Sequence, residues 1–359
     1  SQIGKNLIHN GAMLVDQRAS DTRTGLGAAD TLLCDRWRGG ANGSPSARWT
    51  ISVETSGGPA TGTRWLKCLN TTADASPGSA EAFTLRQALE AQNLQSLVTS
   101  GTLGAMTISG KSIAHADGAS SISFPAKLAC GVTTSDGTAR QFYTDITFAA
   151  ADTWTDFSIT IPADGTATID NNNGQGLNFQ FGMYGGSGRV AATATWENDG
   201  ADSITANSDN WADATNNYIG FTQIQIEAGT VATDFEHEPV SVTLAKCQRY
   251  FYRCTPTASD ISIGYCNAVR EGKFNFSLPV VMRAVPSIAH STASEFSHHD
   301  GDATTGAIAL SDLLLQNANS QPYITLLSRH SGGSTYTVGQ TMRLVANDAG
   351  ATFDLTAEI

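Results

Sequence analysis

Charged residues are scarce in this sequence, and those present are mainly acidic. Only 15% of the 359 residues are Asp, Glu, Lys or Arg, and the formal net charge is -12 with a pI near 4.9. A protein that follows nucleic-acid phosphates or an anionic membrane needs a stripe of Lys and Arg, which the sequence lacks. We therefore predict no nucleic-acid partner and no membrane partner.

Long apolar runs and paired cysteines are also missing. No segment approaches the roughly 18 to 20 apolar residues that span a bilayer. The first residues, SQIGKNLIHNGAM, lack the charged start and apolar middle of a secretion signal, so a chain that starts here is expected to be made in a cytoplasm. The six cysteines form no CxxC pair, and we interpret them as mostly buried small apolar residues rather than as zinc ligands.

Familiar catalytic motifs are absent as well. The chain has no GxSxG, HExxH or GxxxxGK[ST] segment. Its one histidine cluster, SHHDGD (297–302), favours a solvated loop over a metal site, because adjacent residues of an extended chain point in opposite directions. Some carboxylates could pair in a glycosidase, but they lie on predicted strands, where exposed positions in the alternating pattern explain them better: Glu54, Asp145, Glu197 and Glu227. We expect no enzyme, with a polysaccharide-degrading enzyme as the less favoured alternative.

What the sequence does contain is the alternation of apolar and polar residues that is typical of half-buried strands. RWTISVE (48–54) places Trp49, Ile51 and Val53 on one face. Gly, Asn and Asp turns separate further segments of this kind: 63–70, 111–116, 127–134, 141–148, 155–162, 176–184, 192–198 and 221–229. We therefore predict an all-β protein, a jelly-roll β-sandwich with little helix. Residues 83–101 depart from the pattern, and we interpret them as a strand over 84–90 followed by a helical turn over 91–98.

The length of the chain and a change in its residue pattern over 225–253 indicate two domains. At 359 residues the chain exceeds one ordinary core. The segment QIEAGTVATDFEHEPVSVTLAKCQRYFYR (225–253) leaves a strand, passes an acidic turn and a proline, and enters a helical turn before another strand. We predict a first domain at 1–239 and a smaller C-terminal β-sandwich at 240–359, which serves interaction or oligomerisation.

Tryptophans on polar strand faces are candidates for sugar binding, because sugar rings stack on aromatic rings. Trp65 alternates with Leu66 and Cys68, which we assign to the core, and Trp37 lies in an arginine-flanked loop, CDRWRGG. These two are the predicted glycan-binding residues. We assign three others to the core: Trp49, Trp154 and Trp196.

The order of several segments resembles virion proteins of tailed bacteriophages. The segments are KNLIHNGAM, CDRW, RQALEA, DTWTDFSITIPAD, GLNFQFGMYGGSG and QIQIEAGTVATDFEHEP followed by KCQRYFYR, and they cover nearly all of residues 5–255. They are similar to tail-fibre or other adhesin-type proteins whose first domain resembles carbohydrate-binding-module jelly rolls. In those modules a structural calcium ion often ties the first strand to the last, and the matching positions here are Asn10 and Glu227. The acidic residue usual after the Asn-Gly pair is replaced by Ala12.

The resemblance implies a structural protein of the virion surface that binds host surface glycans and contacts other virion proteins. A homo-oligomer, with a trimer favoured, is part of that expectation. A different class of protein fits the same composition: a capsid or tail decoration protein that binds only other virion proteins and buries its aromatic residues at subunit contacts.

Overall fold

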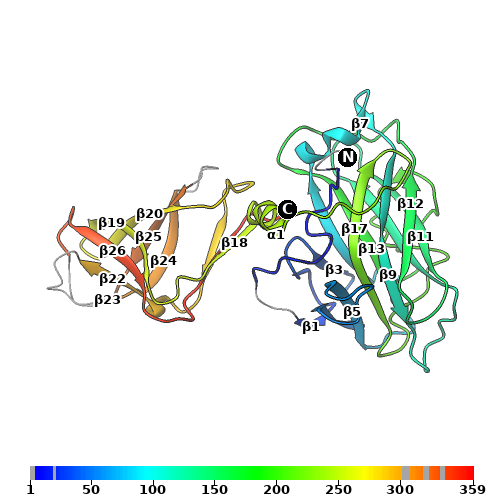
Figure 1. Ribbon diagram of the computed structural model, residues 1–359, viewed down its shortest axis with the longest axis horizontal. Helices are drawn as coiled ribbons and strands as arrows, with labels where there is room; N and C mark the ends of the chain where they lie inside the picture. The colour runs from blue at the N-terminus through cyan, green and yellow to red at the C-terminus, as the bar shows by residue number, and fades with distance from the viewer. Residues whose placement is uncertain (1–4, 19–21, 301–307, 318–322, 332–335) are drawn as a thin grey trace. The chain divides into compact units, whose positions relative to one another are not determined.

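The computed structural model describes residues 5–18, 22–300, 308–317, 323–331 and 336–359 (Figure 1). The chain divides into two compact units, an N-terminal unit of residues 1–243 and a C-terminal unit of residues 244–358. Helix α1 (Val240–Gln248) contains the point of division. The boundary predicted from the sequence, between residues 239 and 240, remains a prediction about independently folding domains.

The N-terminal unit is a β-sandwich of two antiparallel sheets. Sheet A runs in the order β1 (Thr22–Leu26), β4 (Arg48–Glu54), β5 (Trp65–Thr72), β17 (Tyr218–Ala228), β9 (Met106–His115) and β12 (Thr155–Ile161). Sheet B runs in the order β15 (Glu197–Asn198), β11 (Arg140–Phe148), β10 (Ala126–Thr134), β13 (Gln175–Gly185), β6 (Ala82–Glu90), β3 (Arg38–Asn42) and β2 (Thr31–Leu32). Neighbours distant in sequence, such as β5 and β17, give the sandwich its jelly-roll character.

Aromatic residues from both sheets fill the space between them. Trp49 of β4 stacks on Phe83 of β6 with ring centroids 5.5 Å apart, and Phe221 of β17 stacks on Phe181 of β13 at 3.9 Å. Strand β4 is buried at every second residue, as the period-two pattern predicts. Trp49 is therefore a core residue, and its assignment is confirmed.

Two irregular segments test the sequence interpretation. Residues 82–97 form strand β6 followed by the 3-10 helix η1 (Ala91–Leu97), so the predicted strand and helical turn are confirmed. The strand predicted over 192–198 is wrong. The chain forms only β14 (Val190–Ala191), which pairs with β16 (Ile204–Thr205), and the short β15, because Ala194 has a positive φ of 57° that interrupts extended backbone. A further small ladder joins β7 (Val98–Thr99) to β8 (Thr102–Leu103).

The C-terminal unit is a second, smaller β-sandwich. Sheet C has the order β18 (Phe251–Cys254), β27 (Phe353–Thr356), β21 (Ser287–His290). Sheet D has the order β23 (Ile308–Ala309), β22 (Phe296–Asp300), β26 (Thr341–Ala346), β19 (Asp260–Ala268), β20 (Glu271–Ser277), β25 (Tyr323–Arg329) and β24 (Asp312–Asn317). The short η2 (Ala293–Glu295) precedes β22. Phe276 packs edge-on against Phe353 across the two sheets at 5.1 Å.

The cysteines are mostly buried, and α1, the α-helix of the described residues, is nine residues long. None of the six cysteines forms a disulfide, and all except the half-buried Cys254 are buried, so their interpretation as mostly buried apolar residues is confirmed. Burial raises the pKa of Cys254 to about 11, so its thiol is protonated at neutral pH. Within the described ranges, the structure has no helix of the length and apolarity that a membrane span needs.

Candidate functional site

Trp37 is part of the core and offers no ring to a ligand. Its side chain is 0% exposed, its indole Nε1 donates to the backbone oxygen of Asn10 at 3.1 Å, and its ring packs edge-on against Phe179 at 6.2 Å. Residues 33–37 form a tight turn in which the backbone N–H of Trp37 donates a hydrogen bond to the backbone oxygen of Cys34. This turn directs the Trp37 ring inward. The prediction of an exposed, glycan-binding Trp37 is wrong.

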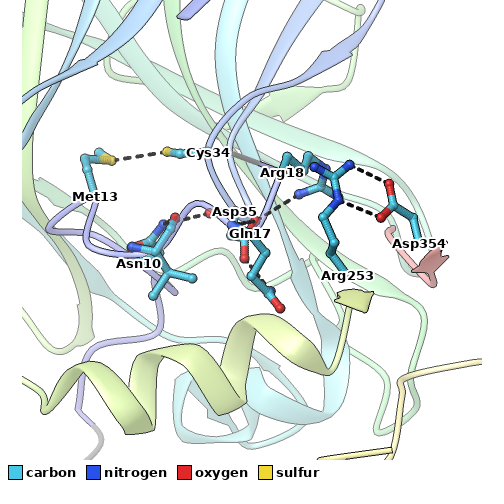
Figure 2. A network of polar contacts seen from close by, with 9 residues as sticks. Asn10, Met13, Gln17, Arg18, Cys34, Asp35, Arg253 and Asp354 are labelled. Atoms are coloured by element: carbon cyan, nitrogen blue, oxygen red, sulfur yellow. Dashed lines mark hydrogen bonds and ion pairs between the residues drawn. The ribbon is translucent and has the colours of Figure 1, made fainter. Parts of the chain in front are cut away.

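The residues predicted to hold calcium are engaged elsewhere. The Asn10 amide donates to the backbone oxygens of Val15 and Asp35, and its Oδ1 accepts from the N–H of Val15 (Figure 2). Both Glu227 oxygens accept hydrogen bonds from Thr233. Calcium is held by oxygen atoms, and these oxygens already have partners that fix local chain turns. Among the described residues, no group of three or more His, Cys, Asp or Glu side chains is placed to hold a metal ion.

The carboxylates considered for glycoside hydrolysis are divided between the two sheets. Glu54 and Glu227 lie on sheet A, whereas Asp145 and Glu197 lie on sheet B. Asp145 accepts hydrogen bonds from Thr205 and Ser208, and Glu197 accepts from Gln141 and from the N–H of Ala192. This arrangement does not bring the four into one cleft.

The face of sheet A that points away from sheet B carries the chemistry expected of a binding surface. On β5 and β9 the core-facing residues, such as Leu66 and Ile108, alternate with residues on this outer face. Strand β17 pairs with β5 on one side and with β9 on the other, and the register of this pairing places side chains from distant segments next to one another. We use the name aromatic cluster for the group at one end of this face: Trp65, Lys67, His115, Asp152, Trp154 and Tyr218.

Tyr218 is the centre of the aromatic cluster. The His115 ring stacks on the Tyr218 ring at 5.2 Å with an interplanar angle of 10°, and Lys67 Nζ lies 4.4 Å from the centroid of the same ring. Trp65 lies 6.4 Å from Tyr218, and Trp154 meets Trp65 edge-on at 5.4 Å. Cation–π and stacking contacts therefore hold these rings in fixed positions.

Asp152 ties the polar groups of the cluster together. Its carboxylate accepts a hydrogen bond from the Tyr218 hydroxyl at 2.8 Å and lies 2.9 Å from His115 Nδ1. Burial raises the pKa of Asp152, but the hydrogen bonds from His115 and Tyr218 outweigh it, so the pKa lies below its usual value. Burial and then the Asp152 carboxylate raise the pKa of Tyr218. The cluster therefore presents a carboxylate and a neutral phenol at neutral pH.

Trp65 lies on the outer face, as predicted, but it is covered. Its side chain is only 6% exposed, its Nε1 donates to the backbone oxygen of Ser56 at 2.7 Å, and its ring lies over Gly220, where an added Cβ would come within 2.5 Å. Trp154, which donates to the backbone oxygen of Gly57, covers another edge. The prediction of an exposed Trp65 is therefore wrong, and Trp154 is the half-exposed indole of this surface.

Replacing Trp65 by alanine is expected to destabilise the N-terminal unit by about 3 kcal/mol, the lower end of the range for a buried aromatic residue, because it removes a buried ring and its edge-on contact with Trp154. Ligand affinity should fall through this loss of order. Urea denaturation followed by tryptophan fluorescence measures the effect. Unchanged stability together with weaker ligand binding would show instead that the ring contacts ligand directly.

A groove of about 450 Å³ lies farther along the same face. Its floor is formed by β9 and β12, where Lys111 and Asp156 make an ion pair, and its wall is the segment 232–237 that follows β17. Phe235 and His237 pack edge-on at 5.0 Å within that wall. Lys111 and His115 are four residues apart on β9 and share a face, so Lys111 of the groove lies about 13 Å along the strand from His115 of the aromatic cluster.

Comparison with known proteins gives only distant likenesses. No family profile and no curated protein matches the sequence. A solved structure of TmCBM61 in complex with β-1,4-galactotriose is 10% identical, with a TM-score of 0.29 over 62% of this chain and 99% of that chain. The enzymatically active domain of bacteriophage CBA120 tailspike protein 4 is 7% identical, with a TM-score of 0.31 over 63% of this chain and 22% of that chain.

A third solved structure, the CBM22-1-CBM22-2 tandem domain of Paenibacillus barcinonensis Xyn10C, is 12% identical. Its TM-score is 0.27, and the match covers 95% of this chain and 99% of that chain. Likeness at this level does not identify a ligand. The β-sandwich assignment rests on the strand order of this chain itself.

Proposed function

We propose that the N-terminal unit binds carbohydrate on the outer face of sheet A. The observation that carries this proposal is the aromatic cluster, in which Trp154, Tyr218 and His115 are only partly covered and lie beside polar groups. Sugar rings have an apolar face that stacks on aromatic rings and a rim of hydroxyls that bond to carboxylate and ammonium groups, such as Asp152 and Lys67. The cluster offers both.

The groove extends the surface that a saccharide can contact. Hydroxyl groups of Ser109 and Ser158, the Lys111–Asp156 ion pair and the half-buried Phe235 line it. Because cluster and groove lie along one strand, a chain of several sugar units can contact both. Residues 1–243 contain 13 Lys and Arg against 24 Asp and Glu, so this acidic unit favours neutral over polyanionic glycans.

At the level of biology, we propose a bacteriophage virion protein, a tail-fibre or receptor-binding component that recognises host surface glycans without cleaving them. The support is the order of sequence segments that resembles such proteins, together with the binding surface described here. Several copies, as in a trimer, would raise the avidity of weak sugar sites without new contacts. A decoration protein that binds only virion proteins is the alternative.

Replacing Trp154 by alanine is expected to weaken glycan binding about tenfold or more, a loss of ~1.4 kcal/mol, because it removes the half-exposed indole of the aromatic cluster. The measurement is binding of the purified protein to an array of bacterial surface polysaccharides, followed by titration calorimetry on the best ligand. Thermal unfolding of the variant is measured in parallel, because Trp154 also covers Trp65.

Trp196→Ala is the matched control for Trp154→Ala. Trp196 is also half-buried and donates its Nε1 to a backbone oxygen, that of Pro162, but it packs against Phe142 of sheet B. Its replacement should leave glycan affinity unchanged. Equal loss of affinity in both variants would contradict a site on sheet A. Absence of binding to any glycan, with tight binding to particles that lack the protein, would favour the decoration protein.

A further inference from the structure

Two histidines lie in the interior of the C-terminal unit, where no function has been assigned to them. His298 of β22 is 0% exposed, and His330, the residue after β25, is 3% exposed. Their ring centroids are 5.8 Å apart, and Tyr336 lies 5.8 Å from the first ring and 5.5 Å from the second. Phe274 of β20 closes the group at 5.8 Å from His298. Two titratable rings therefore occupy places that a core normally gives to apolar side chains.

The hydrogen bonds around this pair suit neutral rings only. His298 Nε2 pairs with the Ser328 hydroxyl, whereas its Nδ1 has no hydrogen-bond partner among the described residues. Neither ring nitrogen of His330 has one in that part of the chain. A protonated imidazole carries two N–H donors, so charging either ring would leave buried charged donors without acceptors.

The charged groups near the pair do not compensate an added proton. In the described strands around it, the carboxylates Glu271 and Asp260 are paired with Arg329 and Arg343, respectively. Burial, then His330 and His299, lower the pKa of His298 to about 4. Burial, then Arg270, lower the pKa of His330. Among the described residues, the groups that lower the two pKa values besides burial are therefore an arginine and further imidazoles.

We propose that His298 and His330 form an acid-sensitive switch that loosens the C-terminal unit while the N-terminal unit stays folded. Protonation expels the rings from the interior and separates β22 and β25 from the strands packed around them. His298 lies on β22 and His330 follows β25, two strands that are not neighbours in sheet D, and Tyr336 contacts both rings, so loss of the pair removes contacts that join these segments.

The direction of the pH effect follows from the sign of the shift. The pKa of His298 is about 4 in the folded state against an ordinary value of 6.5, so the unfolded state binds more protons between these values. The C-terminal unit therefore loses stability as the pH falls through this window. For His298 alone, the linkage amounts to about a 100-fold increase in the opening equilibrium between pH 7 and pH 4.

The test is hydrogen exchange with mass spectrometry on the 359-residue chain between pH 8 and pH 4, after correction for the intrinsic exchange rate. Peptides that cover β20, β22 and β25 should lose protection as the pH falls. All six tryptophans lie between residues 37 and 211, so tryptophan fluorescence reports on the N-terminal unit alone and should remain native. Uniform protection of the three strands down to pH 4 would refute the switch.

Substitutions assign the effect to the pair. His330→Phe removes two nitrogens without partners and should fold at least as well at pH 7. It should retain more protection at pH 4, and His298→Phe combined with it should remove the acid response. The control is His299→Gln, which replaces a half-buried neighbour and should keep the response. If His330→Phe responds to acid like the unmodified protein, the pair is not the switch, whether or not the double variant folds.

Discussion

Replacing Trp37 by alanine should unfold the N-terminal unit or cost it about 3–5 kcal/mol of unfolding free energy, the range for truncation of a large core aromatic residue. The ring is fully buried against Phe179, and its indole N–H satisfies the backbone oxygen of Asn10. The substitution therefore creates a cavity and leaves the Asn10 oxygen with the hydrogen bond from the Met13 N–H but without the one from the indole. Urea denaturation followed by circular dichroism measures the loss.

The same tryptophan-to-alanine change at Trp196 should cost much less, about 1 kcal/mol, because that ring is only half-buried. Comparison of the two variants separates the effect of burial from the effect of losing a tryptophan. If Trp37→Ala remains as stable as the unmodified protein but loses glycan affinity, then the ring is accessible in solution and the original sequence interpretation is correct.

The sequence predicted strands well because the signal for a strand is local. Residues 48–54 alternate on their own, and the pattern alone places Trp49 in the core. The strand and helical turn over 82–97 also depend on nearby residues. The segment 192–198 alternates too, but it forms no continuous strand because the chain turns at Ala194, which the alternation does not reveal.

The exposure of individual tryptophans could not be predicted in the same way. Alternation correctly places Trp65 on the face opposite Leu66, but its cover comes from Ser56 and from Trp154, which lies far along the chain. Trp37 lies in a turn, where no alternation of apolar and polar residues indicates which side chains are buried. Burial at both positions depends on tertiary contacts that a one-dimensional pattern does not contain.

Apart from Trp65, the residues of the candidate site were missed in the sequence for a related reason. His115 and Tyr218 become neighbours through the register of β9 against β17, a pairing between segments about one hundred residues apart. Asp152 joins them from the turn before β12. The alternation of 111–116 and 221–229 marked both strands, but it gave no register. His115 lies within the predicted strand 111–116, but Tyr218 precedes the predicted strand 221–229, so a search of the predicted strands for aromatic side chains would have reached His115 and not Tyr218.

A buried ion pair holds together the segment that also contains Asn10 (Figure 2). Arg18 Nη1 lies 3.1 Å from Asp35 Oδ1, with side-chain exposures of 6% and 1%. Gln17 adds hydrogen bonds to both Asp35 oxygens at 3.3 and 2.5 Å. Burial raises the pKa of Asp35 to about 6, and the bonds from Gln17 and the charge of Arg18 offset only part of that rise. Removing the cation would leave a buried carboxylate without its counter-charge.

Arg18→Met should therefore destabilise the N-terminal unit by about 3–5 kcal/mol at pH 8, the usual cost of breaking a buried pair from one side. The folded-state pKa of Asp35 lies above its ordinary value of 3.8, so its contribution to stability is greatest at low pH and is lost as the pH rises through 6. In the variant this pKa rises further, and the deficit should shrink at pH 5, where Asp35 takes up a proton.

Urea denaturation at pH 5 and pH 8, followed by tryptophan fluorescence, measures the Arg18→Met deficit in the N-terminal unit alone. Adding Asp35→Asn to Arg18→Met is the control, since a neutral amide needs no counter-charge and should recover much of the stability at pH 8. An equal deficit at both pH values would mean that Arg18 acts through packing rather than charge. In the Arg18→Met variant, acid should stabilise the N-terminal unit because it neutralises the buried Asp35 carboxylate. Acid should destabilise the C-terminal unit because it charges the buried imidazoles of His298 and His330. The stability of the two units should therefore change in opposite directions in one pH titration of this variant.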